Sequence, residues 1–264
     1  MKSTSTFAGL SLALSLAAIP TAIAQTTQSV LASVETQDFS DDAGSLRTAM
    51  LEYKLDLGDT TVVVSPTIGQ RRVAGDAQTA IGGGGAIYHD WSDRVSTRTQ
   101  AFVAEEAPVF AHLDFAQDVT FKVADSTALT AGVRWAEFFG DREVTFLSLG
   151  ARRYFKGGSI AYQLTRVNPD NRAGFFGHMV NLTVNDGRGK GKTRLWASTG
   201  NSSLVRSQLE DNFTGKDRAL LVQRTQPLTE KLALVASAGV SSYARPGNRI
   251  GSTTFGIGLS VAID

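Results

Sequence analysis

The sequence predicts an all-β fold, an antiparallel transmembrane β-barrel of about 14 strands that follows a cleaved signal peptide. Three observations support this prediction. The chain has a short export segment, its apolar and polar residues alternate, and no later apolar run is long enough for a membrane helix. A count of twelve strands stays open as an alternative. We expect a signal peptide at 1–24 and an outer-membrane barrel domain at 25–264.

The N-terminus has the three parts of a signal peptide. Lys2 supplies a positive charge, an uncharged apolar stretch runs from Phe7 to Ile19, and small residues stand at Ala22 and Ala24. This stretch is too short to cross a bilayer, which needs roughly twenty residues of helix. We therefore expect export and cleavage near Ala24–Gln25, with a short membrane anchor as the alternative. The chain has no cysteine, so it has no disulfide bond and no cysteine for lipid attachment.

The charges of the chain are balanced, with 26 Lys and Arg residues against 25 Asp and Glu residues. A nucleic-acid-binding chain carries a concentrated positive patch, so we expect no nucleic-acid partner. The expected partners are the lipids of a Gram-negative outer membrane and the barrel-assembly machinery that inserts such proteins. A component of an envelope polysaccharide system is a further candidate partner.

The last segment shows the alternation most clearly. Successive side chains of a strand point to opposite faces of the sheet. One face here is apolar, and the other carries Gly, Ser, Ala and Asp. We expect this strand to face lipid through Phe255, Ile257, Leu259, Val261 and Ile263.

The same alternation recurs upstream, and turn signals such as Lys156–Gly158 separate the segments. We expect strands near 29–38, 44–56, 60–69, 78–91, 95–105, 110–124, 127–138, 142–155, 159–168, 174–185, 192–200, 217–227, 231–244 and 250–263. Tight connections are expected at 57–59, 92–94, 125–126, 156–158 and 228–230, and mostly longer ones at 39–43, 70–77, 169–173, 201–216 and 245–249. An even strand count puts both termini and the tight turns on the periplasmic side. The link Asn185–Gly191 does not fit, because it is long yet falls on that side.

A soluble β-sandwich or lipocalin-like barrel is the main alternative, because its sheets also alternate, with the apolar face inward. The second face of each segment here carries mostly small or polar residues, which suits a polar lumen better than a packed core. The aromatic content of 8% is low for a membrane barrel with two aromatic girdles. Phe138–Phe139 and Phe175–Phe176 nevertheless fall near strand ends, where girdle residues belong.

The run Ala131–Val167 resembles the middle of the YaiO family of outer-membrane β-barrels. It carries an Arg-aromatic pair at Arg134–Trp135 and a basic-aromatic segment at Arg152–Phe155. The segments Ser33–Ser40 and Phe255–Ile263 are similar to the family's first and last strands. The resemblance implies an outer-membrane location, fourteen strands and a loose association with surface polysaccharide. The chain departs from such barrels by ending in Ile-Asp instead of an aromatic residue.

No residue pattern in the chain points to catalysis. The three histidines, His89, His112 and His178, lack the local motifs of barrel hydrolases. The pairs Asp41–Asp42 and Glu105–Glu106 sit in expected outward links, where solvated acidic side chains are more common than a calcium site. We predict that the chain is not an enzyme and has no metal or cofactor.

The glycine-rich and basic segments also have simple structural interpretations. Gly82–Gly85 lacks the strand-to-helix switch and the Lys-Ser/Thr of a phosphate loop. Glycines within a strand instead mark a bend or a close backbone approach. The basic residues among glycines at 188–192 could contact phosphate groups, although a solvated loop is the simpler interpretation.

Charged residues on the inward face are the best functional candidates. Alternation assigns to the lumen Glu52, Lys54, Lys122, Arg134, Arg152 and Arg194. Such residues tune ion preference if the lumen conducts, and otherwise they pair across a filled interior. We predict a narrow pore for small solutes or ions, partly gated by 201–216. The alternative is a non-catalytic binding or assembly component of the cell envelope.

Overall fold

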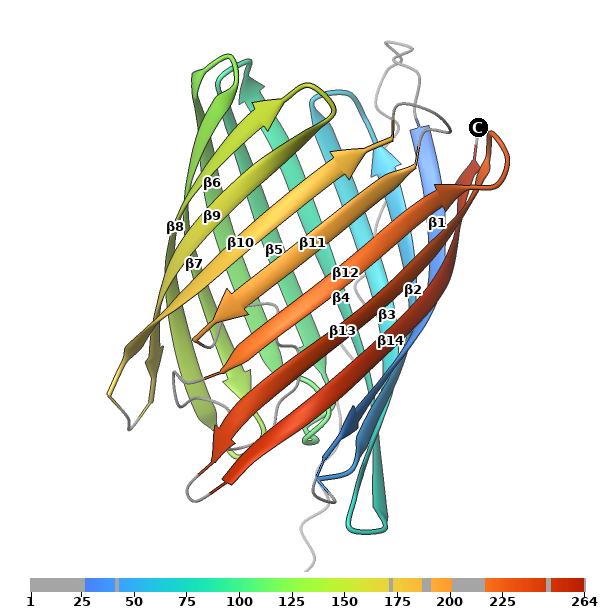
Figure 1. The fold of residues 1–264 in the computed structure, drawn as a ribbon, viewed down its shortest axis with the longest axis vertical. Helices are drawn as coiled ribbons and strands as arrows, with labels where there is room; N and C mark the ends of the chain where they lie inside the picture. The colour runs from blue at the N-terminus through green and yellow to red at the C-terminus, as the bar shows by residue number, and fades with distance from the viewer. Residues whose placement is uncertain are drawn as a thin grey trace, which may run out of the picture.

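The computed structural model describes residues 27–40, 43–170, 173–186, 191–200, 217–245 and 248–263. These residues form a closed barrel of fourteen antiparallel strands, which confirms the predicted fold class (Figure 1). The expected signal peptide at 1–24 lies outside the described residues. Among the residues that are described, no helix is long and apolar enough to cross a membrane.

The strands begin and end close to where the alternation predicts. Their bounds are β1 Thr27–Phe39, β2 Ser45–Asp56, β3 Thr60–Val73, β4 Asp76–Ser92, β5 Val95–Ala104, β6 Leu113–Ala124, β7 Thr127–Phe138, β8 Arg142–Phe155, β9 Gly158–Pro169, β10 Phe175–Asn185, β11 Lys192–Thr199, β12 Arg218–Pro227, β13 Leu232–Arg245 and β14 Asn248–Ile263. Each strand pairs with its neighbours in sequence, so the topology is a simple meander.

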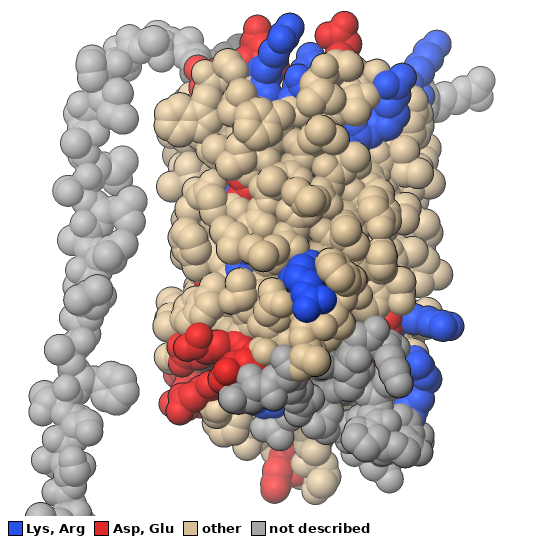
Figure 2. Space-filling view, turned by 90° about the vertical axis from the view of Figure 1, so that its left-hand side faces the viewer, with Lys and Arg blue, Asp and Glu red and all other residues tan. Residues whose placement is uncertain are grey.

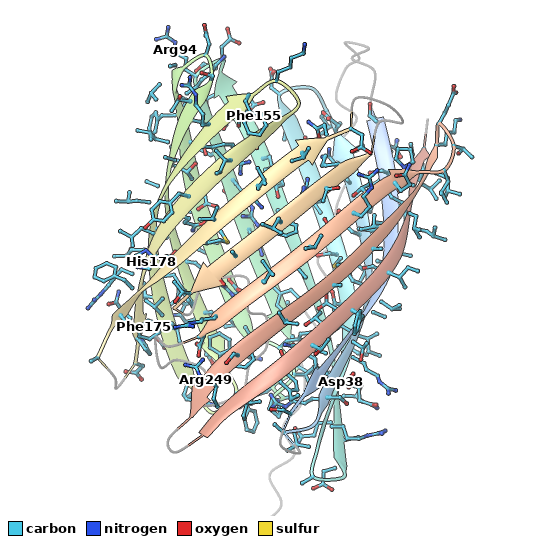
Figure 3. The ribbon with its side chains drawn as sticks, in the orientation of Figure 1. Asp38, Arg94, Phe155, Phe175, His178 and Arg249 are labelled. Atoms are coloured by element: carbon cyan, nitrogen blue, oxygen red, sulfur yellow. The ribbon has the colours of Figure 1, made fainter. Side chains whose placement is uncertain are left out.

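The barrel closes where β1 pairs with β14. This seam runs from Gln28 opposite Ile263 to Phe39 opposite Ser252. The start of β1 and the end of β14 therefore lie at the same end of the barrel, which we call the terminal end; the other is the distal end. Arg94 and Phe155 lie toward the terminal end, and Asp38 and Arg249 toward the distal end (Figure 3).

The link expected at 70–77 is a tight two-residue turn in the structure. Ala74 and Gly75 both have positive φ, at 50° and 93°, as a type I′ hairpin turn requires. The strands β3 and β4 therefore continue to Val73 and from Asp76, and their hairpin extends past its neighbours at the distal end (Figure 1). The prediction of a longer link was wrong because the strand pairing continues through polar residues.

The pairing register sorts strand residues into two sets of rows. Outer rows carry large apolar side chains that are exposed, as lipid contact requires. In β14 the residues of this row are Phe255, Ile257, Leu259, Val261 and Ile263, with exposed fractions from 56% to 40%. Inner rows are the alternate positions, which face the interior of the closed barrel. Figure 2 shows an uncharged belt between two ends that carry most of the charges on the visible face.

Candidate functional site: the barrel lumen

The six residues assigned to the lumen all occupy inner rows. Glu52 and Lys54 lie on β2, Lys122 on β6, Arg134 on β7, Arg152 on β8 and Arg194 on β11. None of the six is fully buried. Their role in conduction stays a prediction, and the structure adds the partners of some of these side chains.

Arg134 is held by a carboxylate of the neighbouring strand. Its Nε donates to both carboxylate oxygens of Asp114, at 2.9 and 3.0 Å, and its Nη2 lies 2.5 Å from Oδ2. The guanidinium also lies over the ring of Phe146, 4.9 Å from the centroid. A forked pair of this kind fixes both side chains, so the charge of Arg134 is largely neutralised.

A second ion pair joins two residues that the sequence interpretation did not single out. Arg98 on β5 lies 3.5 Å from the carboxylate of Asp118 on β6. Gly132 on β7 leaves room for this carboxylate, because a Cβ there would collide with Asp118. The available signal was alternation, which places both charges on the inner rows of paired strands.

Several other inner-row cations have no acidic partner among the described residues, whereas Lys122 lies 4.0 Å from Asp125 Oδ1. Arg152 donates to Ser159 Oγ at 3.1 Å, and no carboxylate of the described chain lies within ion-pair distance of Lys54 or Arg194. Lys192 also lies on an inner row of β11, on the same face of the strand as Arg194. The inner wall therefore has a net positive region.

The link between β5 and β6, residues 105–112, enters the barrel at its distal end. Val109 and Ala111 are only 1% and 3% exposed. A Cβ on Gly69, an inner-row residue of β3, would come within 2.7 Å of Val109 Cγ1 and would also collide with the ring of Phe110. The link therefore fills space next to the barrel wall, and we call residues 105–112 the inner loop.

The inner loop packs against two sides of the wall. One cluster joins Val109 and Phe110 to inner-row residues and the first link: Phe39, Ala43, Leu46, Ala80, Tyr243 and Ile250. The other joins Ala111 to Ala136, Phe138, Val144, Phe146, Val167 and Phe175. The inner loop therefore occupies part of the interior, and the expected strand start at 110 was wrong, because β6 begins only at Leu113.

A polar network lies beside the first cluster. Gln37 donates to Ser252 Oγ at 2.8 Å and to the Tyr243 hydroxyl at 3.2 Å. Ser241 Oγ bonds to the same two hydroxyls. Because Gln37, Tyr243 and Ser252 are nearly fully buried, this network stabilises the wall on which the inner loop rests.

The histidines have structural partners. His89 contacts Thr60 Oγ1, His112 contacts the carbonyl oxygen of Ala104, and His178 contacts the Tyr162 hydroxyl. Within the described part of the chain, no group of three His, Asp or Glu residues is arranged to hold a metal ion. That the chain is not an enzyme stays a prediction.

The acidic and glycine-rich segments are also placed. Glu105 accepts a hydrogen bond from the backbone N–H of Ile81 at 2.9 Å, while 41–42 lies outside the described residues. Gly82 and Gly84 face inward under Phe102, where a Cβ would come within 2.7 and 2.9 Å of its ring. The two glycines therefore allow the Phe102 ring of β5 to lie close to the backbone of β4. The basic stretch at 188–190 lies outside the described residues.

Comparison with known proteins supports the membrane-barrel interpretation. The model of the YaiO membrane beta barrel domain matches residues 27–204, which confirms the resemblance seen in the sequence. Among solved structures, a bacterial polysaccharide outer membrane secretin is similar, with 9% identity, a TM-score of 0.54 and coverage of 89% of this chain and 98% of that chain. An anion-selective porin from Comamonas acidovorans has 9% identity, a TM-score of 0.47 and coverage of 90% and 99%. At such identities, similarity concerns the fold alone.

Proposed function

Because the chain belongs to the YaiO family of membrane β-barrels, and is thus an outer-membrane barrel, we propose that it forms a narrow pore for small solutes or ions that favours anions. One observation carries this proposal. Lys54, Arg152, Lys192 and Arg194 occupy inner rows, keep accessible surface and lack acidic partners among the described residues.

Unpaired charges favour a hydrated lumen for a physical reason. An ionised side chain without a partner costs several kcal/mol or more in a dry interior. Water removes most of this cost, and mobile anions can then balance the excess charge. In a dry, filled barrel we would expect each inner cation to pair with a carboxylate, as Arg98 and Arg134 do in this protein.

The inner loop sets the width of the proposed path. Its apolar residues Val109 and Phe110 occupy the distal part of the interior. The four unpaired cations are not among the inner-row residues that pack against the loop. Conduction then requires either a gap beside the loop or its displacement. A gating role for 201–216 stays a prediction, because those residues lie outside the described part of the chain.

Planar-bilayer recording of the full mature protein tests the proposal. In a potassium chloride gradient we expect a reversal potential that indicates chloride preference. Arg152→Glu combined with Arg194→Glu should shift the preference towards potassium, whereas Lys156→Glu, in an exposed turn, should leave it unchanged. Arg134 is a poor choice for this test, because Asp114 already balances its charge.

Silent bilayers from folded protein would refute the pore, provided that a variant with a loosened inner loop is silent too. The second candidate function, a binding or assembly component linked to surface polysaccharide, would then remain. The two apolar clusters at the distal end favour that candidate, because they hold the inner loop inside the barrel, where it would block a path for solutes. Crosslinking in intact cells, with envelope polysaccharide as the first ligand to examine, is its direct test.

A further inference from the structure

A basic side chain interrupts the apolar outer rows on one side of the barrel. Arg166 on β9 pairs directly with Leu147 on β8 and with Phe176 on β10, and both neighbours are about half exposed. Leu147, Arg166 and Phe176 thus share one outer row. An arginine that faces lipid is unfavourable by about 2–4 kcal/mol at the bilayer midplane and less near the interface, so its position calls for a partner.

The guanidinium of Arg166 is positioned by two neighbours. Nε donates to Asn168 Oδ1 at 3.1 Å, and Cζ lies 4.8 Å from the centroid of the Phe176 ring. No carboxylate of the described residues lies within ion-pair distance of it. The group is therefore held in place, and no carboxylate of the described residues balances its charge.

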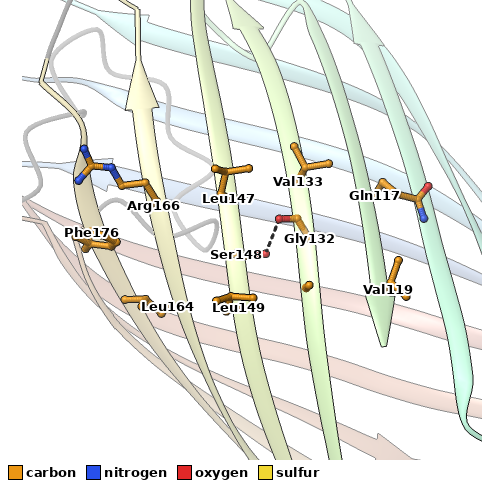
Figure 4. A pocket seen from close by; sticks show the side chains of 11 residues that line it. Gln117, Val119, Gly132, Val133, Leu147, Ser148, Leu149, Leu164, Arg166 and Phe176 are labelled. Carbon is orange, nitrogen blue, oxygen red and sulfur yellow. Dashed lines mark hydrogen bonds between the residues drawn. The ribbon is translucent and has the colours of Figure 1, made fainter. Parts of the chain in front are cut away.

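An apolar groove of about 520 Å³ adjoins this guanidinium. It is shaped by two adjacent outer rows, in which Ala131 is smaller than its neighbours Val119 and Leu149. Figure 4 shows Leu147, Leu149 and Leu164 near Arg166 and Phe176. The groove thus combines a cation at one edge with a floor of aliphatic side chains.

We propose that Arg166 and this groove bind a phosphorylated glycolipid of the outer leaflet, with a lipid phosphate on the guanidinium and an acyl chain along Leu147, Leu149 and Leu164. A planar guanidinium matches a phosphate through two parallel hydrogen bonds. Arg166 lies near the distal end of β9, which finishes at Pro169. The distal end is assigned to the outside because short turns and termini are periplasmic in such barrels.

The site is separate from the proposed pore, since it lies on outer rows and uses no lumen residue. Arg153 provides a matched control. It also occupies an outer row, on β8, but toward the terminal end, where it donates to Thr127 Oγ1 at 2.8 Å. Ala131→Phe provides a second variant, because a phenyl ring at this outward position would fill the groove without removing a charge.

Native mass spectrometry of the full mature protein in detergent, titrated with purified bis-phosphorylated lipid A, is the experiment. We expect one bound lipid, with affinity reduced roughly tenfold or more by Arg166→Gln, since a charge-assisted pair contributes about that factor. Ala131→Phe should also weaken binding, and Arg153→Gln should not. Dephosphorylated lipid A should bind the unchanged protein as weakly as intact lipid A binds Arg166→Gln.

Three outcomes would overturn the proposal: equal losses in Arg166→Gln and Arg153→Gln, equal affinity for the dephosphorylated lipid, or a dimer that forms at the groove in place of lipid binding. If Arg166→Gln does not fold, the test rests on Ala131→Phe and on the comparison of intact with dephosphorylated lipid A. Retention of the heat-dependent gel shift shows that each variant is folded.

Discussion

Replacing Val109 with alanine should release the inner loop from the barrel wall. Val109 is 1% exposed and belongs to the cluster that includes Phe39, Leu46 and Tyr243. The substitution removes two buried carbon atoms and leaves their space empty, while the backbone of the loop and the strands is unchanged.

The size of the effect follows from that burial. Two buried carbons contribute about 1.6 kcal/mol at about 0.8 kcal/mol each, and the residual cavity raises the cost to roughly 2 kcal/mol. Because every 1.4 kcal/mol is a factor of ten, the ratio of released to packed loop should rise about 30-fold. The barrel itself should lose little stability, because only the ends of the loop, Glu105 and His112, share backbone hydrogen bonds with the strands.

Cysteine labelling measures this ratio directly, since the natural chain has no cysteine. Ala111→Cys places a thiol at a position that is 3% exposed, so a maleimide reacts only when the loop leaves the wall. We expect its labelling rate to rise about 30-fold when Val109→Ala is added. The control is Val240→Ala, which shortens an outer-row side chain that is 56% exposed. Equal labelling rates in folded Val109→Ala and Val240→Ala proteins would refute the packed inner loop.

Three further predictions concern the wall and its rim. Leu259→Arg should destabilise the membrane-inserted barrel by roughly 2–4 kcal/mol if the position is near the midplane, and Ser260→Arg by much less; equal effects in urea titrations in vesicles would mean that the rows are wrongly assigned. Gly82→Val should cost about 1–3 kcal/mol by overpacking against a phenylalanine ring, while Gly83→Ala should be tolerated, because the nearest atom to its Cβ is 3.9 Å away; similar melting temperatures would contradict this. At the terminal rim, the hydrogen bond from Arg224 holds the pKa of Asp186 below its usual 3.8. The stability that this ionised carboxylate contributes is fully present at neutral pH and is lost as pH falls through the lowered pKa. Asp186→Asn should therefore reduce the difference in the free energy of unfolding between pH 7 and pH 3.

Strand positions could be predicted well because a half-exposed strand must alternate along its whole length. The expected bounds 127–138 and 142–155 coincide with β7 and β8. The pattern is strong there because residues such as Leu147 and Leu149 must face lipid on one side, while Ser148 must face the interior on the other. Alternation of this kind is a local property, so a single sequence can reveal it.

The inner loop could not be predicted in the same way. Val109 and Phe110 resemble the start of a strand, and the expected strand began at 110, whereas β6 begins at Leu113. Their apolar character instead reflects contacts with residues far away in sequence, such as Tyr243. Pro108 was the one local warning, because proline rarely lies within a paired strand. The partner of Arg134 was missed for the same reason: alternation gives a face but not a contact.

The seam between β1 and β14 constrains how the protein can fold and insert into the membrane. Until Ile263 lies opposite Gln28 and Ser252 opposite Phe39, both edge strands present unpaired backbone groups, each of which costs several kcal/mol in hydrocarbon. A chain that stops short of β14 has no smaller stable form to adopt in the bilayer, and its open edges would recruit other strands instead. A stable closed barrel therefore depends on the sixteen residues of β14.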